Sequence, residues 1–444
     1  MLASLGMILI GTSAGLSTSE QVKAASGNQA ATKDTLKVLF WSAEDFNRTY
    51  GEKFSKEYPN TDIQVVGPTV TEWPVNYSSA IEKYSPDLVM LPPSDYKRMS
   101  KDKKLTDLEP LIKRDNYDMT TLYPGLIAEL KKQGGGNLYG LSHRAQSYAL
   151  LYNVDLFKKY NVKAPSEVAT WEEILKLASK FPTKGDKNTR IWGLSSTGSG
   201  NMVREIARTE GLMPMDPITL KATANTAAWK NAYRLAVEAT KSGVLDERIT
   251  LSAKSYLESS TFIMGRSAMT VASISQLQDL QKAKSGVKNY KPFTLGIAAG
   301  PADSKNRNST GNYFGSDIFA IPAGAANVDA AWDFIQYFNG VDYAKDYYNP
   351  KASNSSISAL SRMTKEYSGY KLDAFYKLRP NLDQTISTSV LSIKAPEFDF
   401  YGFVDSELKQ VISGKKTLDK ATAAIQSKTQ RVADQLAKAQ KTKK

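Results

Sequence analysis

Few side chains in this sequence could carry out catalysis. Cysteine is absent and His143 is the single histidine, which excludes thiolate nucleophiles, thiolate metal sites and any site with two histidine ligands. A lone histidine beside Arg144 favours a structural hydrogen-bonding role over that of a general base. No Gly-x-Ser-x-Gly nucleophile motif occurs. A carboxylate pair for glycoside hydrolysis stays open, because any two acidic residues could approach each other in the fold.

Two glycine-rich segments could be mistaken for nucleotide sites. Residues 195–200 precede an expected helix, and their amides could hold an anion, but the segment lacks the lysine of a P-loop. Residues 134–136 have neither the Rossmann spacing nor a strand before them, so they indicate a turn. No cofactor is expected.

The charge balance bears on possible partners. The 444-residue chain has a net charge of +13, with 41% hydrophobic and 23% charged residues, which is typical of a soluble globular protein. The basic residues are spread along the chain, with local clusters at 97–104 and 438–444. No nucleic-acid-binding module accompanies them. The surplus therefore favours a protein working beside an anionic cell envelope over one that binds nucleic acid.

The N-terminal segment resembles an export signal. Residues 1–15 are apolar and uncharged, and small residues suited to signal peptidase follow at 22–25. The apolar run is shorter than the roughly 20 residues of a spanning helix. We expect a signal peptide at 1–24 and a linker at 25–34, although no basic stretch precedes Leu2. A buried N-terminal helix is the alternative. Residues 9–12 resemble a lipoprotein box with Thr12 in place of cysteine, so a thioether-linked lipid is excluded there.

Strand and helix patterns alternate along the rest of the chain. Strands are expected at 36–41, 63–66, 87–91, 191–194, 295–299 and 317–321, and helices near 76–84, 171–181, 226–242, 327–338 and 418–436. The continuous apolar run at 87–91 is typical of a buried parallel strand. Thr170 and Glu173 form a potential capping box before an apolar helix face. This order predicts α/β sheets in two units of similar size.

Several of these segments together resemble one family. They are residues 38–41, 54–59, 85–89, 105–108, 139–141, 151–157, 170–173, 262–269, 330–335 and 411–416. Each is weak alone, but their order over nearly the whole mature chain resembles the extracellular solute-binding proteins of ABC importers, in the sugar-binding group that includes maltose-binding protein. The resemblance implies a monomer that binds a solute outside the cell and is not an enzyme.

The resemblance also implies a two-lobed periplasmic-binding-protein fold of type II, with the ligand in the cleft. Lobe 1 would comprise 35–145 plus 316–349, and lobe 2 would comprise 146–315 plus 350–437, followed by a basic tail at 438–444. The chain would cross between the lobes near 145–147, 312–316 and 348–352. The lobes would close on a carbohydrate by hinge motion, and the closed form would dock on permease subunits at the bacterial surface.

Sugar sites combine aromatic faces with fixed hydrogen-bonding groups. Matching by position gives these expected ligand contacts: Trp41, Glu44, Asp45, Trp73, Asp95, Arg144, Gln146, Tyr313, Phe314, Asp317, Phe400 and Tyr401. Trp41, Phe400 and Tyr401 have a core interpretation as an alternative, and the acidic residues could instead stabilise helix starts. Trp171, Trp192 and Trp332 are expected in the core.

One departure from the family pattern affects ligand specificity. Relatives often carry a glycine and a tryptophan after the segment 268–270, whereas residues 271–275 here contain no aromatic. The ligand would then be smaller, or would stack on Trp73, Tyr313 and Phe314. Arg144 suggests an acidic sugar such as a uronate. The alternatives are a protein of the same fold for a polyamine, a metal or an anion, and a polysaccharide-active enzyme.

Overall fold

The computed structural model describes residues 34–68, 76–186, 189–196, 198–216, 219–246, 253–288, 290–314, 317–347, 357–358, 365–382 and 398–442. The expected signal peptide and most of the expected linker lie outside these ranges, as does Trp73. Among the described helices, none combines the length and apolar character that a membrane span requires.

The first lobe is built on a five-stranded sheet with the order β2-β1-β3-β14-β4. Its strands are β1 (Asp34–Leu39), β2 (Thr61–Val66), β3 (Leu88–Leu91), β14 (Ile318–Ala320) and β4 (Gly140–Leu141). β1 pairs in parallel with β2 and β3, whereas β14 runs antiparallel to β3 and β4. A strand from late in the chain therefore completes a sheet that the N-terminal residues begin.

Helices cover this sheet with apolar faces. They are α1 (Ala43–Phe46), α2 (Glu52–Glu57), α3 (Tyr77–Tyr84), α4 (Pro93–Lys101), α5 (Glu109–Arg114), α6 (Pro124–Gln133), α13 (Val328–Phe338) and α14 (Val341–Tyr347). The core is rich in aromatic rings: Phe54 and Phe319 both contact Phe334, with ring centroids 5.1 and 5.3 Å away. Asn327 caps α13, as expected, by accepting a hydrogen bond from the Ala330 amide.

The second lobe is built on a six-stranded sheet with the order β7-β11-β6-β10-β8-β9. Its strands are β7 (Val168–Thr170), β11 (Leu295–Ala302), β6 (Ala149–Asn153), β10 (Ser267–Ala272), β8 (Trp192–Ser195) and β9 (Leu245–Asp246). β8, β9 and β10 are mutually parallel, while β6 runs antiparallel to β10 and β11. The ends of β8 and β10 therefore lie at one edge of the sheet.

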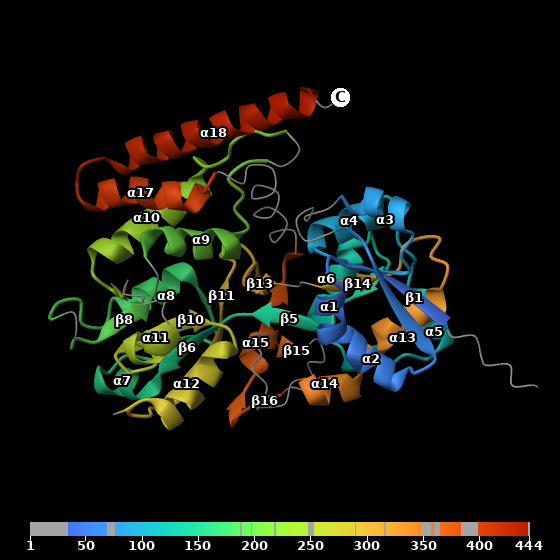
Figure 1. The fold of residues 1–444 in the computed structure, drawn as a ribbon. Coiled ribbons are helices and arrows are strands. Elements are labelled where there is room, and N and C mark those ends of the chain that lie inside the picture. Colours follow the sequence, from blue (N-terminus) through green and yellow to red (C-terminus); the bar gives the residue numbers. More distant parts are fainter. Residues whose placement is uncertain are drawn as a thin grey trace, which may run out of the picture.

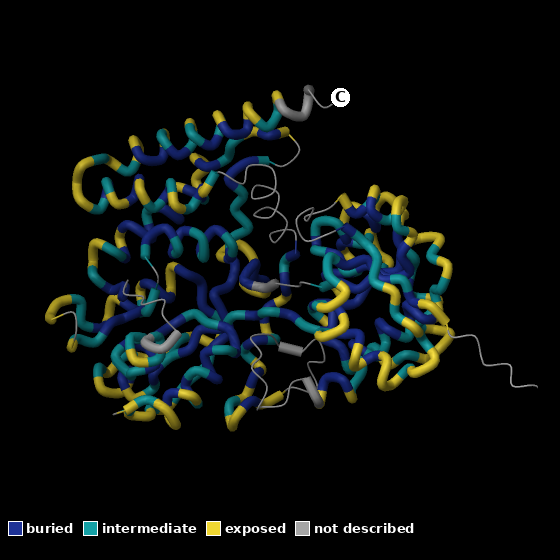
Figure 2. Tube along the Cα trace, in the orientation of Figure 1, coloured by how far each residue is buried: buried dark blue, intermediate teal, exposed yellow. Residues whose placement is uncertain are grey.

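The helices of the second lobe are α7 (Val154–Lys159), α8 (Trp171–Ala178), α9 (Ser199–Glu210), α10 (Ala227–Lys241), α11 (Ala253–Ser259), α12 (Ser275–Gly286), α17 (Phe400–Ile412) and α18 (Leu418–Thr442). α8 starts with the expected capping box of Thr170 and Glu173. Figure 1 shows α17 and α18 on the outer side of this lobe. In Figure 2 the buried residues gather inside each lobe and the exposed ones on outer helix turns.

Short strands connect the lobes. β5 (Arg144–Ser147) lies between them (Figure 1) and pairs antiparallel with β13 (Tyr313–Phe314) and β15 (Ile357–Ser358). Small pairs also join β12 (Ser309–Thr310) to β18 (Arg379–Pro380) and β16 (Glu366–Tyr367) to β17 (Tyr370–Lys371), beside α15 (Asp373–Lys377). The two-lobed α/β fold is thus the one expected, while the exact lobe boundaries stay a prediction.

The segment from 365 to 382 contacts both lobes. The Tyr123 hydroxyl, in the loop before α6, donates a hydrogen bond to the Leu378 carbonyl at 2.7 Å. The Leu382 amide donates to Glu129 on α6 at 3.2 Å, and α15 packs against β11. The segment that we assigned to lobe 2 from sequence therefore also packs against lobe 1.

Candidate ligand-binding site

A cavity of about 720 Å³ opens where the parallel strands β8 and β10 end. The carboxyl ends of parallel strands are a common ligand position in α/β folds. The lining residues are Gln146, Tyr148, Trp171, Leu194, Ser195, Ser196, Met202, Glu205, Tyr256, Leu257, Ser259, Ser260, Thr270, Val271, Ala272, Ser273, Ser275, Gln276, Asp279 and Lys282. The volume lies within the range of small-molecule sites.

Local structure explains why these side chains meet. Ser195 ends β8, and the β10 residues Thr270 to Ala272 lie at that strand's end. Gln276, Asp279 and Lys282 follow each other at three-residue spacing on α12, so they share one helix face. β5 supplies Gln146, so the cavity borders the strand that joins the lobes.

Glu205 is the main charged group on the α9 side of the cavity. Arg208, one turn away, donates hydrogen bonds to both of its carboxylate oxygens at 3.2 and 3.5 Å. Burial raises the pKa of Glu205, against the opposing effect of the positive charges of Arg208 and Arg204. Burial, and then the charge of Glu205, raise the pKa of Tyr148. The wall therefore presents an acceptor and a phenol side by side.

A buried hydrogen-bond network fixes this wall. The Trp171 indole donates to the Thr209 hydroxyl at 2.9 Å and to the Glu205 carbonyl at 3.2 Å. Asn312, immediately before β13, donates to the same Thr209 hydroxyl at 3.0 Å. Thr209 and Asn312 are both fully buried. The network thus links the cavity wall to a strand that joins the lobes.

The α12 side of the cavity offers further polar groups. Asp279 and Lys282 form an ion pair at 3.6 Å, and burial raises the pKa of Asp279 while Lys282 opposes that shift. Burial, and then Asp279, raise the pKa of Tyr256. Gln276 is buried, and its Nε2 has no hydrogen-bond partner within the described part of the chain. Within the described residues, that amide is a donor that a ligand could use.

The chemistry of the cavity suits a polyhydroxylated ligand. Hydroxyls, amides and carboxylates can satisfy sugar hydroxyls, and Tyr148 and Tyr256 offer ring faces. Across the described residues no three histidine or acidic side chains cluster as metal ligands would. The hydroxyls, amides and rings of the lining are groups that can recognise such a ligand.

Of the residues expected from sequence, Gln146 lies in the cavity wall. The backbone of Tyr313 and Phe314 forms β13, paired with Ser147 and Gln146 of β5. Trp73 lies outside the described residues. Trp41 is half-buried and stacks on Phe40 with ring centroids 3.7 Å apart.

Several expected ligand contacts instead pair with each other or with neighbours. Arg144 on β5 donates through Nε to Asp317 at 2.7 Å, and its Nη2 contacts the same carboxylate oxygen. In the first lobe Asp45 pairs with Arg48, and Asp95 pairs with Arg98 at 2.6 Å. These carboxylates lie in the first turns of α1 and α4, the helix-start alternative considered above. Glu44 shares the first turn of α1 and is exposed.

Phe400 has the position of a core residue. It is 3% exposed and its ring contacts Trp229 with centroids 5.3 Å apart. The expectation of a ligand contact at Phe400 does not fit this burial, because the amphipathic helix α17 turns that ring inward. Tyr401, one residue further, lies on another face and lines a second cavity of about 460 Å³.

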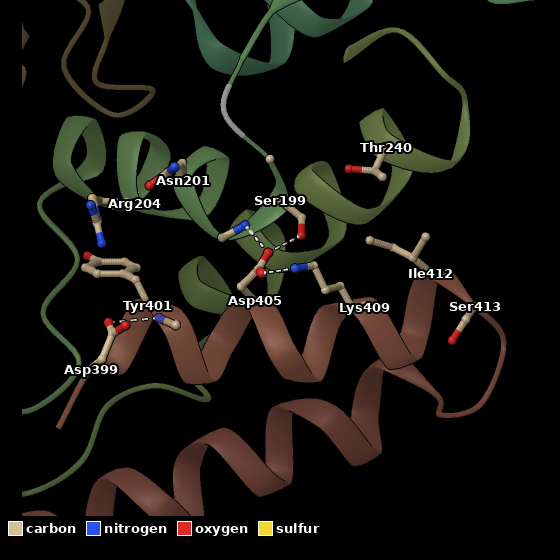
Figure 3. A pocket seen from close by; sticks show the side chains of 13 residues that line it. Ser199, Asn201, Arg204, Thr240, Asp399, Tyr401, Asp405, Lys409, Ile412 and Ser413 are labelled. Atoms are coloured by element: carbon tan, nitrogen blue, oxygen red, sulfur yellow. Dashed lines mark hydrogen bonds and ion pairs between the residues drawn. The ribbon is translucent and has the colours of Figure 1, made fainter. Parts of the chain in front are cut away.

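This second cavity lies between α9, α10 and α17 (Figure 3). Asp405 accepts hydrogen bonds from the Ser199 hydroxyl at 2.8 Å and the Gly200 amide at 3.0 Å, and pairs with Lys409 at 2.7 Å. Burial raises the pKa of Asp405, but these hydrogen bonds outweigh it and the net pKa is lowered. A protein carboxylate therefore already occupies the anion position that the helix start offers, so we take the larger cavity as the ligand site.

Sequence reasoning missed several residues of the larger cavity. Tyr148, Glu205, Tyr256 and Gln276 were not among the expected contacts, and Trp171 was expected only as core, which it also is at 3% exposed. Two signals pointed to the region: the Ser- and Gly-rich segment after β8 and the unusual residues 271–275. Both segments supply lining residues.

Comparisons with known proteins agree with this architecture. The sn-glycerol-3-phosphate-binding periplasmic protein UgpB of Pectobacterium atrosepticum is 20% identical over 428 residues, covering 89% of this chain and 90% of the relative. An extracellular solute-binding protein of family 1 from Alicyclobacillus acidocaldarius has a TM-score of 0.61 at 17% identity, covering 90% of this chain and 98% of that structure.

Two further solved structures share the fold. The sugar-binding protein MalE from Xanthomonas citri has a TM-score of 0.59 at 15% identity, covering 91% of this chain and 98% of that structure. A sugar transporter from Rhizobium etli in an open conformation has a TM-score of 0.59 at 19% identity, covering 89% and 98%. A family model described as bacterial extracellular solute-binding protein matches residues 49–370. With that match spanning most of its length, the chain belongs to the family of bacterial extracellular solute-binding proteins.

Proposed function

We propose that this protein captures a sugar or short oligosaccharide outside the cell membrane and delivers it to the permease of an ABC importer. The observation that carries the proposal is the cavity at the ends of β8 and β10, with its hydroxyl, amide and tyrosine lining beside the connecting strand β5. The two fold relatives that are a sugar transporter and a sugar-binding protein support the choice of solute. Binding, without chemical conversion, is the proposed activity.

Hinge closure would complete the site. The cavity walls described above belong to the second lobe and to the β5 segment, so the first lobe would supply the opposing wall when the lobes approach. Trp41 and Asp95 of the first lobe are the proposed contacts from that side. The closed form would be the one that the permease recognises.

The proposal includes the cellular setting. Residues 1–24 would direct export and residues 25–34 would act as a linker, and the protein would work as a monomer at the cell surface. With Thr12 in the lipoprotein-like segment, a lipid thioether would not anchor it at that position.

Other solutes fit the cavity less well. A polyamine cation would have to displace Arg208 from Glu205 or Lys282 from Asp279. A uronate held by Arg144 would compete with Asp317, which already engages the guanidinium group. A neutral sugar can bind without displacing any of these ion pairs.

A thermal-shift assay of the chain from Ala25 onward tests the proposal. The ligands are maltotriose, cellotriose, galactobiose, D-mannitol, spermidine and sn-glycerol 3-phosphate. A ligand at 100 times its Kd stabilises the native state by about 2.7 kcal/mol, so one sugar class should raise Tm by several degrees. If spermidine alone raises Tm, or if no sugar raises it, the proposed solute is wrong.

A pair of variants locates the binding. Val271 lines the proposed ligand cavity, and Val271→Trp should fill it and abolish the sugar-induced shift. Ser413 lines the second cavity, and Ser413→Trp is the matched control that should keep the shift. The opposite pattern would assign the ligand to the second cavity.

A further inference from the structure

The ligand cavity differs in charge from the protein that contains it. The whole chain carries a net charge of +13. The charged side chains that line the cavity are Glu205, Asp279 and Lys282, so the lining has one more negative than positive charge. A basic protein that presents an acidic binding surface has a local charge pattern that its composition does not predict.

We infer that Glu205 is the specificity-determining residue of this cavity, and that it admits uncharged sugars while excluding uronates and phosphorylated sugars. The inference rests on the proposed function and deepens it, because it names the charge class of the solute. It also separates this chain from its glycerol-3-phosphate-binding relative, whose ligand carries a phosphate.

The geometry of Glu205 suits this role. Its side chain is 29% exposed, so part of the carboxylate remains accessible from the cavity. Arg208 donates to both carboxylate oxygens through one nitrogen, Nη1. An ionised carboxylate has about four acceptor positions, so positions remain that can accept hydrogen bonds from two neighbouring sugar hydroxyls.

The backbone of Glu205 is held in place by the network behind it. Its carbonyl accepts hydrogen bonds from the Trp171 indole at 3.2 Å and from the Thr209 hydroxyl at 2.8 Å. Trp171 and Thr209 are both buried. A carboxylate on a fixed backbone turn cannot withdraw easily, so an anionic ligand would meet its charge in a partly desolvated wall, where repulsion is strong.

The nearby cations already have partners, and Arg208 is paired with Glu205 itself at 3.2 Å. Lys282 is paired with Asp279, which lies one turn away on the same helix, α12. Arg204, on the same helix as Glu205, lies over the Tyr401 ring at 4.8 Å in the second cavity, as Figure 3 shows. A ligand carboxylate or phosphate that bound Arg208 or Lys282 would therefore have to displace an existing ion pair, whereas a neutral hydroxyl would not.

Calorimetry with matched ligands tests the inference on the chain from Ala25 onward. Galactobiose is compared with digalacturonate, and maltotriose with a maltotriose in which one residue is oxidised to the uronate. Wild type should bind the neutral member of the accepted pair at least tenfold more tightly than its acidic partner. Glu205→Gln removes the negative charge and leaves Arg208 in place, so the discrimination should fall to threefold or less.

Glu238 provides the matched control. It is exposed on the neighbouring helix α10, where it pairs with Arg234 at 2.6 Å, away from the cavity lining. Glu238→Gln changes the net charge by the same amount and should keep the wild-type discrimination. Equal loss in both variants would assign the effect to overall charge and refute the role of Glu205.

The outcomes separate this inference from the proposed function. If wild type binds the acidic member as tightly as the neutral one, or if Glu205→Gln leaves the discrimination unchanged, the inference is wrong while sugar binding stands. If neither member of any pair binds, the proposed function fails and takes the inference with it.

Discussion

The single histidine should control the acid stability of the first lobe. His143 is 2% exposed, and its ring stacks on Phe319 with centroids 5.3 Å apart and an angle of 8° between the planes. Tyr50 and Tyr343 contact it edge-on at 5.8 and 5.6 Å. Replacing the imidazole in His143→Phe keeps an aromatic ring in this stack and removes the titrating group.

The expected magnitude follows from proton linkage. Burial lowers the pKa of His143 well below its usual value, and the positive charges of Arg144 and Lys53 lower it further. Below a pH of about 6.5 the unfolded chain therefore takes up a proton that the folded chain excludes. The free energy of unfolding has its full value above this pH and decreases as the pH drops towards the pKa of the folded state. For an unfolded pKa of about 6.5, the loss between pH 7.5 and 5.5 is about 1.4 kcal/mol.

Urea unfolding at the two pH values measures this loss. Carboxylate titrations occur in both proteins and cancel in the difference between wild type and His143→Phe. We expect wild type to lose about 1.4 kcal/mol more than the variant between pH 7.5 and 5.5. Because the chain has one histidine, its imidazole proton resonance can be followed directly by NMR.

Two results would refute this reasoning. One is an equal loss of unfolding free energy in wild type and His143→Phe over this pH range. The other is a folded-state imidazole that titrates near its usual value, which would mean that water or a counter-charge reaches the ring.

Three further tests have defined outcomes. Asp317 has a left-handed φ of 66°, and Asp317→Ala and Asp317→Gly both remove the same ion pair. In urea unfolding, Asp317→Ala should be less stable than Asp317→Gly by about 1 kcal/mol. Equal unfolding free energies would mean that the backbone relaxes. A Cβ at Gly200 would lie 2.6 Å from the Asp405 Cβ, so Gly200→Ala should lower the unfolding free energy by about 1–3 kcal/mol. A Cβ at Gly286 would meet nothing within 4 Å, so Gly286→Ala should leave the unfolding free energy nearly unchanged. Trp171→Phe removes the indole donor of a buried network and should lower the free energy of urea unfolding by about 1–3 kcal/mol. A loss below about 0.5 kcal/mol, which is typical of a surface substitution, would mean that the remaining groups find other hydrogen-bond partners.

Local sequence patterns predicted the elements well. The apolar run before Pro92 forms β3, and the Thr170 capping box starts α8 as expected. Trp171, Trp192 and Trp332 are buried as expected, at 3, 4 and 0% exposed. These features depend on hydrophobic periodicity and on hydrogen bonds within a few residues, so the chain encodes them locally.

The candidate site was less accessible to sequence reasoning. Gln146 was predicted and lies in the cavity wall. Arg144 and Asp317 were both assigned to the cleft, but nothing local indicated that they would pair with each other across 173 residues of sequence. Glu205 and Gln276 lie inside helices, where their polar character alone is typical of a solvent-exposed face.

The sequence by itself determined the α/β class, the helix caps and the buried tryptophans, because each follows from side-chain spacing and short-range hydrogen bonding. Only the tertiary structure decided which polar groups meet. The order of strands in the second sheet brings the ends of β8 and β10 together with α9 and α12, and so places Glu205 and the local pair of Asp279 and Lys282 on one cavity. This arrangement is set by contacts between elements that are far apart in the chain, and local periodicity carries no information about them.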